Sequence, residues 1–178
     1  MSDSYLDEIS DVYISETQIR EKVKQLGEII SQDYGNKNLL LVGILKGSFI
    51  FLSDLMREIT IPAAVDFMTV SSYKNSTSSS GNVDIISDLS RDIEGLDVLI
   101  VEDIIDSGMT LSKLLPILNA RKPASVKLCT LLDKPERRKT DIKVDYVGFE
   151  IENKFIVGYG LDFAEKYRNL KYIGIYNN

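Results

Sequence analysis

The residues best suited to chemistry gather in one short stretch of the sequence. An apolar run at residues 98–101 is followed at once by two adjacent carboxylates, Glu102 and Asp103, and soon afterwards by a third, Asp106. Neighbouring side chains on an extended backbone point to opposite sides. We therefore expect the side chains of Glu102 and Asp103 to be splayed. This arrangement suits the binding of separated hydroxyls or of a hydrated metal ion better than the action of a coupled acid pair.

The third carboxylate opens a turn of small and hydroxyl-bearing residues, and a helix is predicted from about Leu111. The turn consists of Asp106, Ser107, Gly108, Met109 and Thr110. Successive backbone N–H groups at a helix N-terminus form a nest that attracts anions, so this turn could bind a phosphate group. The alternative is simple N-capping of the helix by Ser107 or Thr110, with a solvated Asp106. The residues alone leave the two interpretations evenly balanced.

The patterns around this loop predict alternating strands and helices. A capping box at residues 15–18 precedes apolar residues at helical spacing, and Gly35 ends that helix. A continuous apolar run at residues 39–44 predicts a strand buried on both faces, and a second helix follows through Arg57. Further strands are predicted at residues 64–70, 83–87, 98–101, 126–132, 146–151, 155–159 and 172–176. These elements indicate an α/β fold, with a mostly parallel twisted sheet flanked by helices in a single domain, residues 1–178.

Composition excludes several kinds of chemistry and location. The chain has no His and a single Cys, so catalytic triads, imidazole bases and internal disulfides are ruled out. The acidic N-terminus does not resemble an export signal, and the longest apolar run is too short to span a bilayer. We therefore expect a cytoplasmic protein with no membrane partner. A net charge of -6 argues against a nucleic-acid partner.

Residues 71–82 are rich in Ser and join two predicted strands. Connections in compact domains usually have about four to six residues, so this one is long. A tolerated hairpin is one interpretation. The other is a lid that closes over a ligand, with Ser72 and Tyr73 as its contact residues.

The acidic loop, VEDIIDSGMT at residues 101–110, closely resembles the phosphoribosyl-diphosphate binding motif of type I phosphoribosyltransferases, and specifically that of the hypoxanthine-guanine branch. The resemblance continues in order along nearly the whole chain. Its further segments are LKG at 45–47, SY at 72–73, LLDK at 131–134, VGFE at 147–150 and KFIVGYGLD at 154–162. The acidic loop alone indicates the superfamily, whereas the later segments select the branch that uses 6-oxopurines.

The resemblance implies a purine salvage enzyme that depends on Mg2+. Its substrates would be hypoxanthine or guanine and 5-phosphoribosyl 1-diphosphate, and its products IMP or GMP and diphosphate. It implies the type I phosphoribosyltransferase fold, with a small hood formed approximately by residues 1–12 and 145–178, and a homodimer or homotetramer. The competing hypothesis is a regulator that keeps this fold and binds nucleotides and RNA. Such a protein would need a basic face, which the net charge of -6 disfavours.

Family likeness also assigns roles around the sugar and its phosphates. It puts Glu102 and Asp103 on the ribose hydroxyls and on magnesium, the turn at residues 106–110 around the 5-phosphate, and Asp106 at purine N7 as the general base. Lys46, Gly47 and Arg168 would receive the diphosphate, with a non-proline cis peptide between Leu45 and Lys46. From the residues alone, Lys46 would be a solvated turn lysine and Arg168 a partner in a surface salt bridge. Met109 departs from the family, which often has Lys there, so backbone amides would carry more of the phosphate binding.

Base recognition is implied for a second group of residues. Lys134 would donate to the exocyclic O6, Phe155 would stack on the purine, and the backbone of Ile156 would contact the edge that bears N1 and C2. Asp162 resembles the ligand of a second magnesium ion. Without the resemblance, Lys134 would be an ordinary charged turn residue, and Phe155 and Ile156 part of a core strand.

Overall fold

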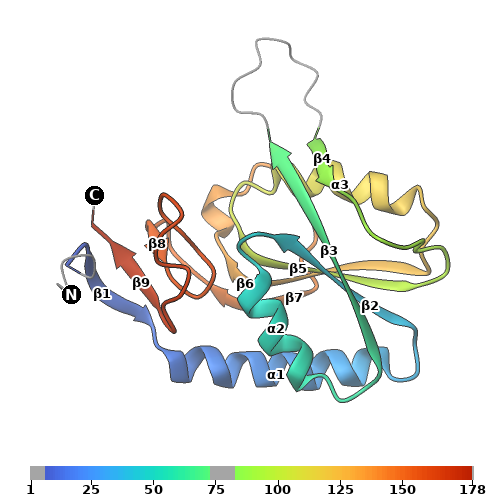
Figure 1. Cartoon of the computed structure of the whole chain (residues 1–178), viewed down its shortest axis with the longest axis horizontal. Helices are drawn as coiled ribbons and strands as arrows, with labels where there is room; N and C mark the ends of the chain where they lie inside the picture. Colours follow the sequence, from blue (N-terminus) through green and yellow to red (C-terminus); the bar gives the residue numbers. More distant parts are fainter. Residues whose placement is uncertain (1–6, 73–82, 178) are drawn as a thin grey trace, which may run out of the picture.

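The computed structural model describes residues 7–72 and 83–177. Within them the chain forms a six-stranded sheet and a separate three-stranded sheet (Figure 1). Neighbours in the larger sheet are parallel, except that β4 runs antiparallel to β3. Its strands, in spatial order, are β4 (Val83–Ser87), β3 (Ala63–Ser72), β2 (Leu39–Leu45), β5 (Asp97–Ile105), β6 (Ser125–Asp133) and β7 (Tyr146–Glu150). The predicted α/β fold is confirmed.

Helices cover both faces of the larger sheet (Figure 1). Side chains alternate along each strand, so Leu41 and Leu99 pack with α1 (Glu16–Tyr34) and α2 (Phe49–Glu58). Their neighbours Leu40 and Val98 pack instead with α3 (Met109–Asn119). The capping box at the start of α1 is present as predicted, and Gly35 follows the helix with a φ of 49°. No helix in the described ranges is long and apolar enough to cross a membrane.

The smaller sheet joins the two ends of the chain. Its order is β1 (Ile9–Ile14), β9 (Ile173–Tyr176) and β8 (Ile156–Val157), all antiparallel. Sequence analysis did not predict β1, because half of its residues are exposed and its partner lies at the other end of the chain. The strand predicted at residues 155–159 was too long, because Gly158, with a φ of 103°, starts a turn that pairs with Leu161. The expected hood range 145–178 includes β7, which pairs with β6 in the larger sheet.

The strand that carries the carboxylates is longer than predicted. It was expected to end at residue 101, before the first charge, whereas β5 continues to Ile105. The prediction was wrong because the end of a strand depends on its neighbour: Ile104 pairs with Leu132 and Ile105 with Asp133 on β6. Glu102 and Asp103 therefore lie on hydrogen-bonded strand backbone rather than in a loop.

The order of strands places a ligand crevice between β2 and β5. From β2 the chain passes through α2 to β3 on one side, and from β5 it passes through α3 to β6 on the other. In open sheets of this kind, ligands bind beyond the carboxyl ends of the strands where the order reverses. The carboxyl ends of β2 and β5 are Leu45 and Ile105, directly beside the residues selected from the sequence.

Candidate active site

The loop after β2 meets the acidic end of β5. The peptide between Leu45 and Lys46 is cis, as the family likeness implies. A Cβ atom on Gly47 would lie 1.7 Å from Oδ2 of Asp103, so any larger residue at this position would displace the carboxylate or the loop. The tertiary fold thus brings the expected diphosphate loop against one of the expected metal-binding carboxylates.

The turn after β5 has the form of an anion nest. Gly108 is the N-cap of α3, with a φ of 76°, and no side chain in the described residues caps this helix. Ser107 Oγ accepts only a long hydrogen bond, 3.4 Å, from the Met109 N–H. A cavity of about 250 Å³ lies over the turn and is lined by Ile44, Val70, Glu102 and residues 104–111. A helix N-terminus without a side-chain cap among the described residues, next to a cavity, favours the anion-binding interpretation over simple capping.

The two adjacent carboxylates are splayed, as expected. Glu102 lines the cavity over the turn, whereas Asp103 faces Gly47. Burial, with the Asp103 charge added, raises the pKa of Glu102 well above its usual range. Burial also raises the pKa of Asp103 to about 6, although the Ile104 N–H opposes the shift. Two half-buried carboxylates with raised pKa values form a site that a cation would stabilise.

This donor set fits magnesium. Within residues 7–72 and 83–177, no three or more His, Cys, Asp or Glu side chains come together as a metal cluster, so Glu102, Asp103 and Asp162 do not form one group. Mg2+ is usually bound by one or two carboxylates together with water and substrate phosphates, rather than by an all-protein cage. Glu102 and Asp103 supply hard oxygen donors of that kind at the mouth of the crevice.

A first prediction concerns the cost of these charges. Because the pKa of Asp103 is about 6 in the folded protein and 3.8 ordinarily, the folded state holds this charge unfavourably above pH 6. Asp103→Asn should therefore raise the melting temperature of the metal-free protein by a few degrees at pH 8. The gain should shrink as the pH falls through 6 towards 4, where the native carboxyl is also neutral. Thermal melts with chelator present, beside the exposed variant Asp141→Asn, measure this; a destabilised Asp103→Asn at pH 8 would contradict it.

A C-terminal arm, defined here as residues 158–168, packs on the loop after β2. A Cβ on Gly160 would lie 2.1 Å from the carbonyl oxygen of Gly47. Arg168 donates from Nη1 to the Gly160 carbonyl at 2.7 Å, and its Nη2 lies 2.7 Å from Oδ1 of Asp162. The arm thus brings Arg168 and Asp162 to Lys46 and Gly47. Arg168 does form the salt bridge that the residues alone suggested, within the expected site.

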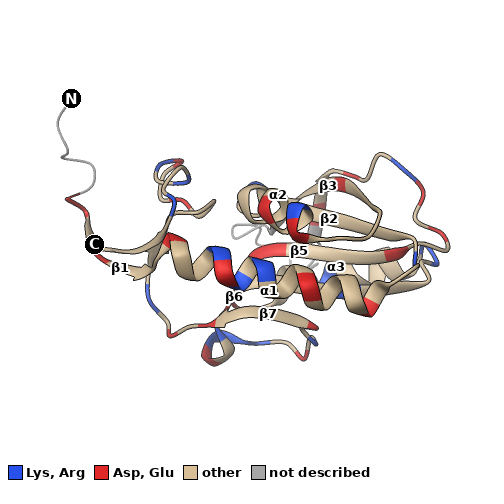
Figure 2. Ribbon diagram, turned by 90° about the horizontal axis from the view of Figure 1, so that it is seen from below, with Lys and Arg blue, Asp and Glu red and all other residues tan. Residues whose placement is uncertain are grey.

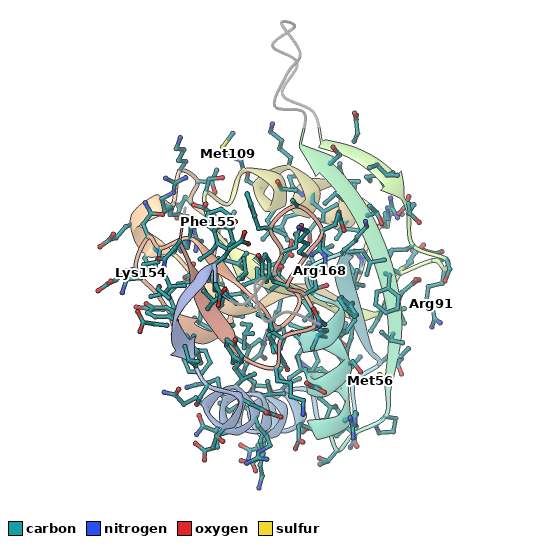
Figure 3. The ribbon with its side chains drawn as sticks, turned by 60° about the vertical axis from the view of Figure 1, so that its left-hand side comes forward. Met56, Arg91, Met109, Lys154, Phe155 and Arg168 are labelled. Carbon is teal, nitrogen blue, oxygen red and sulfur yellow. The ribbon has the colours of Figure 1, made fainter. Side chains whose placement is uncertain are left out.

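The residues expected to recognise the base directly follow β6 or lie at or just before the start of β8. Lys134 is 7% exposed, and its Nζ donates to the Lys154 carbonyl at 2.7 Å. Burial lowers the pKa of Lys134, and the Asp106 charge opposes that shift. Phe155 is 49% exposed and packs edge-on against Phe163, with ring centroids 5.6 Å apart. In Figure 3, Phe155 lies on the same side of the view as Met109 of the turn after β5, whereas Met56 and Arg91 lie on the other side.

The remaining residues predicted for the site are Ile156 and the two lid residues. Ile156 is buried in β8, and its backbone pairs with β9. Ser72 ends β3, while its expected partner in the lid, Tyr73, lies outside the described residues.

Two residues that sequence analysis did not assign to the site make close contacts with it. Arg137, which lies in the 3-10 helix η2 (Pro135–Arg137), donates from Nε to Oδ1 of Asp106 at 2.9 Å. Glu165 forms an ion pair with Lys46. Nothing local in the sequence separates these contacts from ordinary surface charges, because both join segments far apart in the chain.

The loop that contains Arg137 also supports the nest. The Lys139 N–H donates to the Ser107 carbonyl at 2.9 Å, and Thr140 Oγ1 donates to the same oxygen at 3.3 Å. The Lys134 N–H donates to the Ile105 carbonyl at 3.0 Å. The backbone of Lys134 is therefore hydrogen-bonded to the residue just before the turn expected to bind phosphate, and the loop after Lys134 is hydrogen-bonded to the turn itself.

Comparison with known proteins agrees with this geometry. A model of the phosphoribosyl transferase domain matches residues 14–164, so the chain belongs to the phosphoribosyltransferase family. Among its relatives is the hypoxanthine-guanine phosphoribosyltransferase of Bacillus subtilis, 54% identical over 168 residues that cover 94% of this chain and 93% of the relative. The hypoxanthine phosphoribosyltransferase of Salmonella typhimurium is 51% identical over 166 residues, 92% of this chain and 93% of that one. A crystal structure of a hypoxanthine phosphoribosyltransferase from Staphylococcus aureus has a TM-score of 0.94 and 47% identity, covering 99% of this chain and 96% of the other.

Proposed function

We propose that this enzyme transfers the 5-phosphoribosyl group of 5-phosphoribosyl 1-diphosphate to hypoxanthine or guanine, forming IMP or GMP and diphosphate. One observation carries the proposal: the nest, the splayed carboxylates and the buried Lys134 share the carboxyl edge of one sheet. That edge offers separate places for a phosphate, a ribose and a purine oxygen. The relatives named above carry this activity in their names.

In the proposed reaction, the bond between purine N9 and ribose C1 forms while the bond from C1 to the diphosphate oxygen breaks. The electron pair of the breaking bond leaves with diphosphate, and the N7 proton passes to Asp106. In this structure Oδ1 of Asp106 accepts a hydrogen bond from Arg137 Nε, and the carboxylate has further acceptor sites for the proton of the base. A positioned general base typically contributes about 10²- to 10⁴-fold to a rate.

The remaining proposed roles concern binding. Glu102 and Asp103 hold the ribose hydroxyls, and the N–H groups of residues 106–110 hold the 5-phosphate, where the exposed Met109 adds no charge. Lys46, the Gly47 backbone and Arg168 receive the leaving diphosphate, whose several oxygens suit a guanidinium fork and an ammonium group. Ser72 and Tyr73 belong to a lid that excludes water.

Magnesium, when bound by Glu102 and Asp103, would neutralise charge on the diphosphate, and Asp162 would contribute to a second ion. In this structure Asp162 accepts hydrogen bonds from Arg168 and from the Glu165 N–H, so it would have to release one of them to do so.

Base choice is proposed to depend on Lys134, Phe155 and Ile156. An ammonium donor at O6 favours hypoxanthine or guanine and repels the amino group that adenine has there. The exposed half of the Phe155 ring supplies a stacking face, and Phe163 and Tyr176 pack around the ring at centroid distances of 5.6 Å. The Ile156 backbone would contact the edge of the base that bears N1 and C2.

Three further features belong to the proposal. The small sheet forms a hood over the sugar site. The chain forms a homodimer or homotetramer through exposed apolar side chains such as Phe49 and Met56 on α2 and Phe67 on β3. The enzyme works in the cytoplasm. The competing RNA-binding regulator needs a basic stripe, but acidic and basic residues alternate along α1 (Figure 2).

The proposal predicts a simple pattern of products. Protein with magnesium and 5-phosphoribosyl 1-diphosphate should convert hypoxanthine and guanine to IMP and GMP, with little product from adenine or uracil. Chromatography of the nucleotides formed measures this, and a chelator should abolish turnover. Tight RNA binding without turnover of either 6-oxopurine would favour the regulator instead.

A further inference from the structure

The carboxylate of Glu165 lies between the two cationic side chains proposed to receive diphosphate. Lys46 Nζ is 3.3 Å from both of its oxygens, and Arg168 Nη2 is 3.6 Å from Oε2. These two cations lie far apart in the sequence, and among the described residues the Glu165 carboxylate contacts both of them. Glu165 therefore occupies the place where an anion would contact both.

Glu165 reaches this position through a backbone turn with unfavourable positive φ angles. Phe163 and Lys166 exchange backbone hydrogen bonds of 3.2 and 3.0 Å across a tight turn. The two central residues, Ala164 and Glu165, have φ values of 51° and 63°, although neither is glycine. Such turns usually carry Asn or Gly, because residues with a Cβ rarely adopt positive φ. The Asp162 carboxylate accepts the Glu165 N–H at 2.9 Å and so holds the turn in this form.

We infer that Glu165 is an internal competitor for the diphosphate site. Its carboxylate pairs with Lys46 and Arg168 when no diphosphate is bound, is displaced when the diphosphate group of the substrate arrives, and returns to help release the product. The inference rests on the proposed function, because that function assigns Lys46 and Arg168 to diphosphate.

The exposures of the two partners support easy displacement. The side chains of Lys46 and Glu165 are each 66% exposed. Exposed ion pairs are weak, so a magnesium-bound diphosphate with several oxygens can replace one carboxylate. The pairing still lowers the apparent affinity, because only the fraction of molecules with free cations can bind.

The alternative is that Glu165 orients the two cations for substrate. The two hypotheses predict opposite signs for Glu165→Gln, a substitution that keeps the size of the side chain and removes its charge. If Glu165 competes, magnesium diphosphate should bind about two- to fivefold more tightly, the range expected from removing an exposed ion pair. If it orients the cations, binding should weaken.

Calorimetric titration with magnesium diphosphate measures this without any turnover. The matched control is Glu16→Gln, which removes an exposed glutamate whose ion-pair partner, at 3.9 Å, is Lys171 rather than Lys46 or Arg168. The control should bind diphosphate as the parent does. The KM for 5-phosphoribosyl 1-diphosphate should fall in Glu165→Gln while the KM for hypoxanthine stays the same, and melting curves check that the variant is folded.

A double variant tests whether the gain in diphosphate affinity depends on Lys46. In a Lys46→Met background, Glu165→Gln should gain less affinity than it gains alone, because one of the two contested cations is gone. Unchanged or weaker diphosphate binding by Glu165→Gln would overturn the inference. An absence of nucleotide formation by the unaltered protein would instead overturn the proposed function, so the two failures are distinct.

Discussion

Asp106→Asn should lower kcat by about 10²- to 10⁴-fold, the range typical of a lost general base. The amide has the size of the carboxylate, and its oxygen can still accept the hydrogen bond from Arg137 Nε, now 2.9 Å long. Substrate positions should therefore be kept while the proton acceptor is lost. Single-turnover and steady-state measurements with hypoxanthine and guanine would show the loss in kcat, with KM values changed by only a fewfold.

A matched control is available outside the site. Asp88 also pairs with an arginine, Arg121, through hydrogen bonds of 2.8 and 2.7 Å. Asp88→Asn should reduce thermal stability and leave kcat unchanged. Equal losses in kcat and in substrate binding for Asp106→Asn would show that Asp106 only shapes the turn.

Gly47→Ala should reduce kcat/KM for 5-phosphoribosyl 1-diphosphate by about 10²-fold, the effect expected when a reacting group moves by about 1 Å. The added methyl would lie 1.7 Å from Oδ2 of Asp103, a distance that no pair of non-bonded atoms tolerates. Either the carboxylate or the loop that carries Lys46 must move. Both movements separate groups that the proposed reaction needs together.

A substitution at a second glycine distinguishes the loss of activity expected for Gly47→Ala from an effect of backbone strain. Gly95 has a φ of 74°, and a Cβ there would meet nothing within 4 Å. Gly95→Ala should lower the melting temperature through strain alone and keep full activity. Steady-state kinetics and thermal melts on both variants test this pair of expectations. Activity of Gly47→Ala within a fewfold of the parent would refute the close contact between the loop and Asp103.

The sequence by itself determined most of the fold and the part of the site at residues 101–110, which contains the carboxylates and the nest. Hydrophobic periodicity and the Ser15 capping box located α1 closely, and the apolar run predicted β2 to within one residue of its observed end at Leu45. These signals are local, because burial and capping depend on residues a few positions apart. The carboxylates and the nest could be read in the same way, since they lie within ten consecutive residues.

The tertiary structure alone decided which distant segments contact the carboxylates and the nest. The contacts of Gly47 with Asp103, Arg137 with Asp106 and Glu165 with Lys46 all join segments distant in the sequence. Which segments meet is set by the order of strands in the sheet, and β1 and the last residues of β5 were missed for the same reason. Pairing across a sheet is a property of two strands, and a single stretch of sequence carries only one of them.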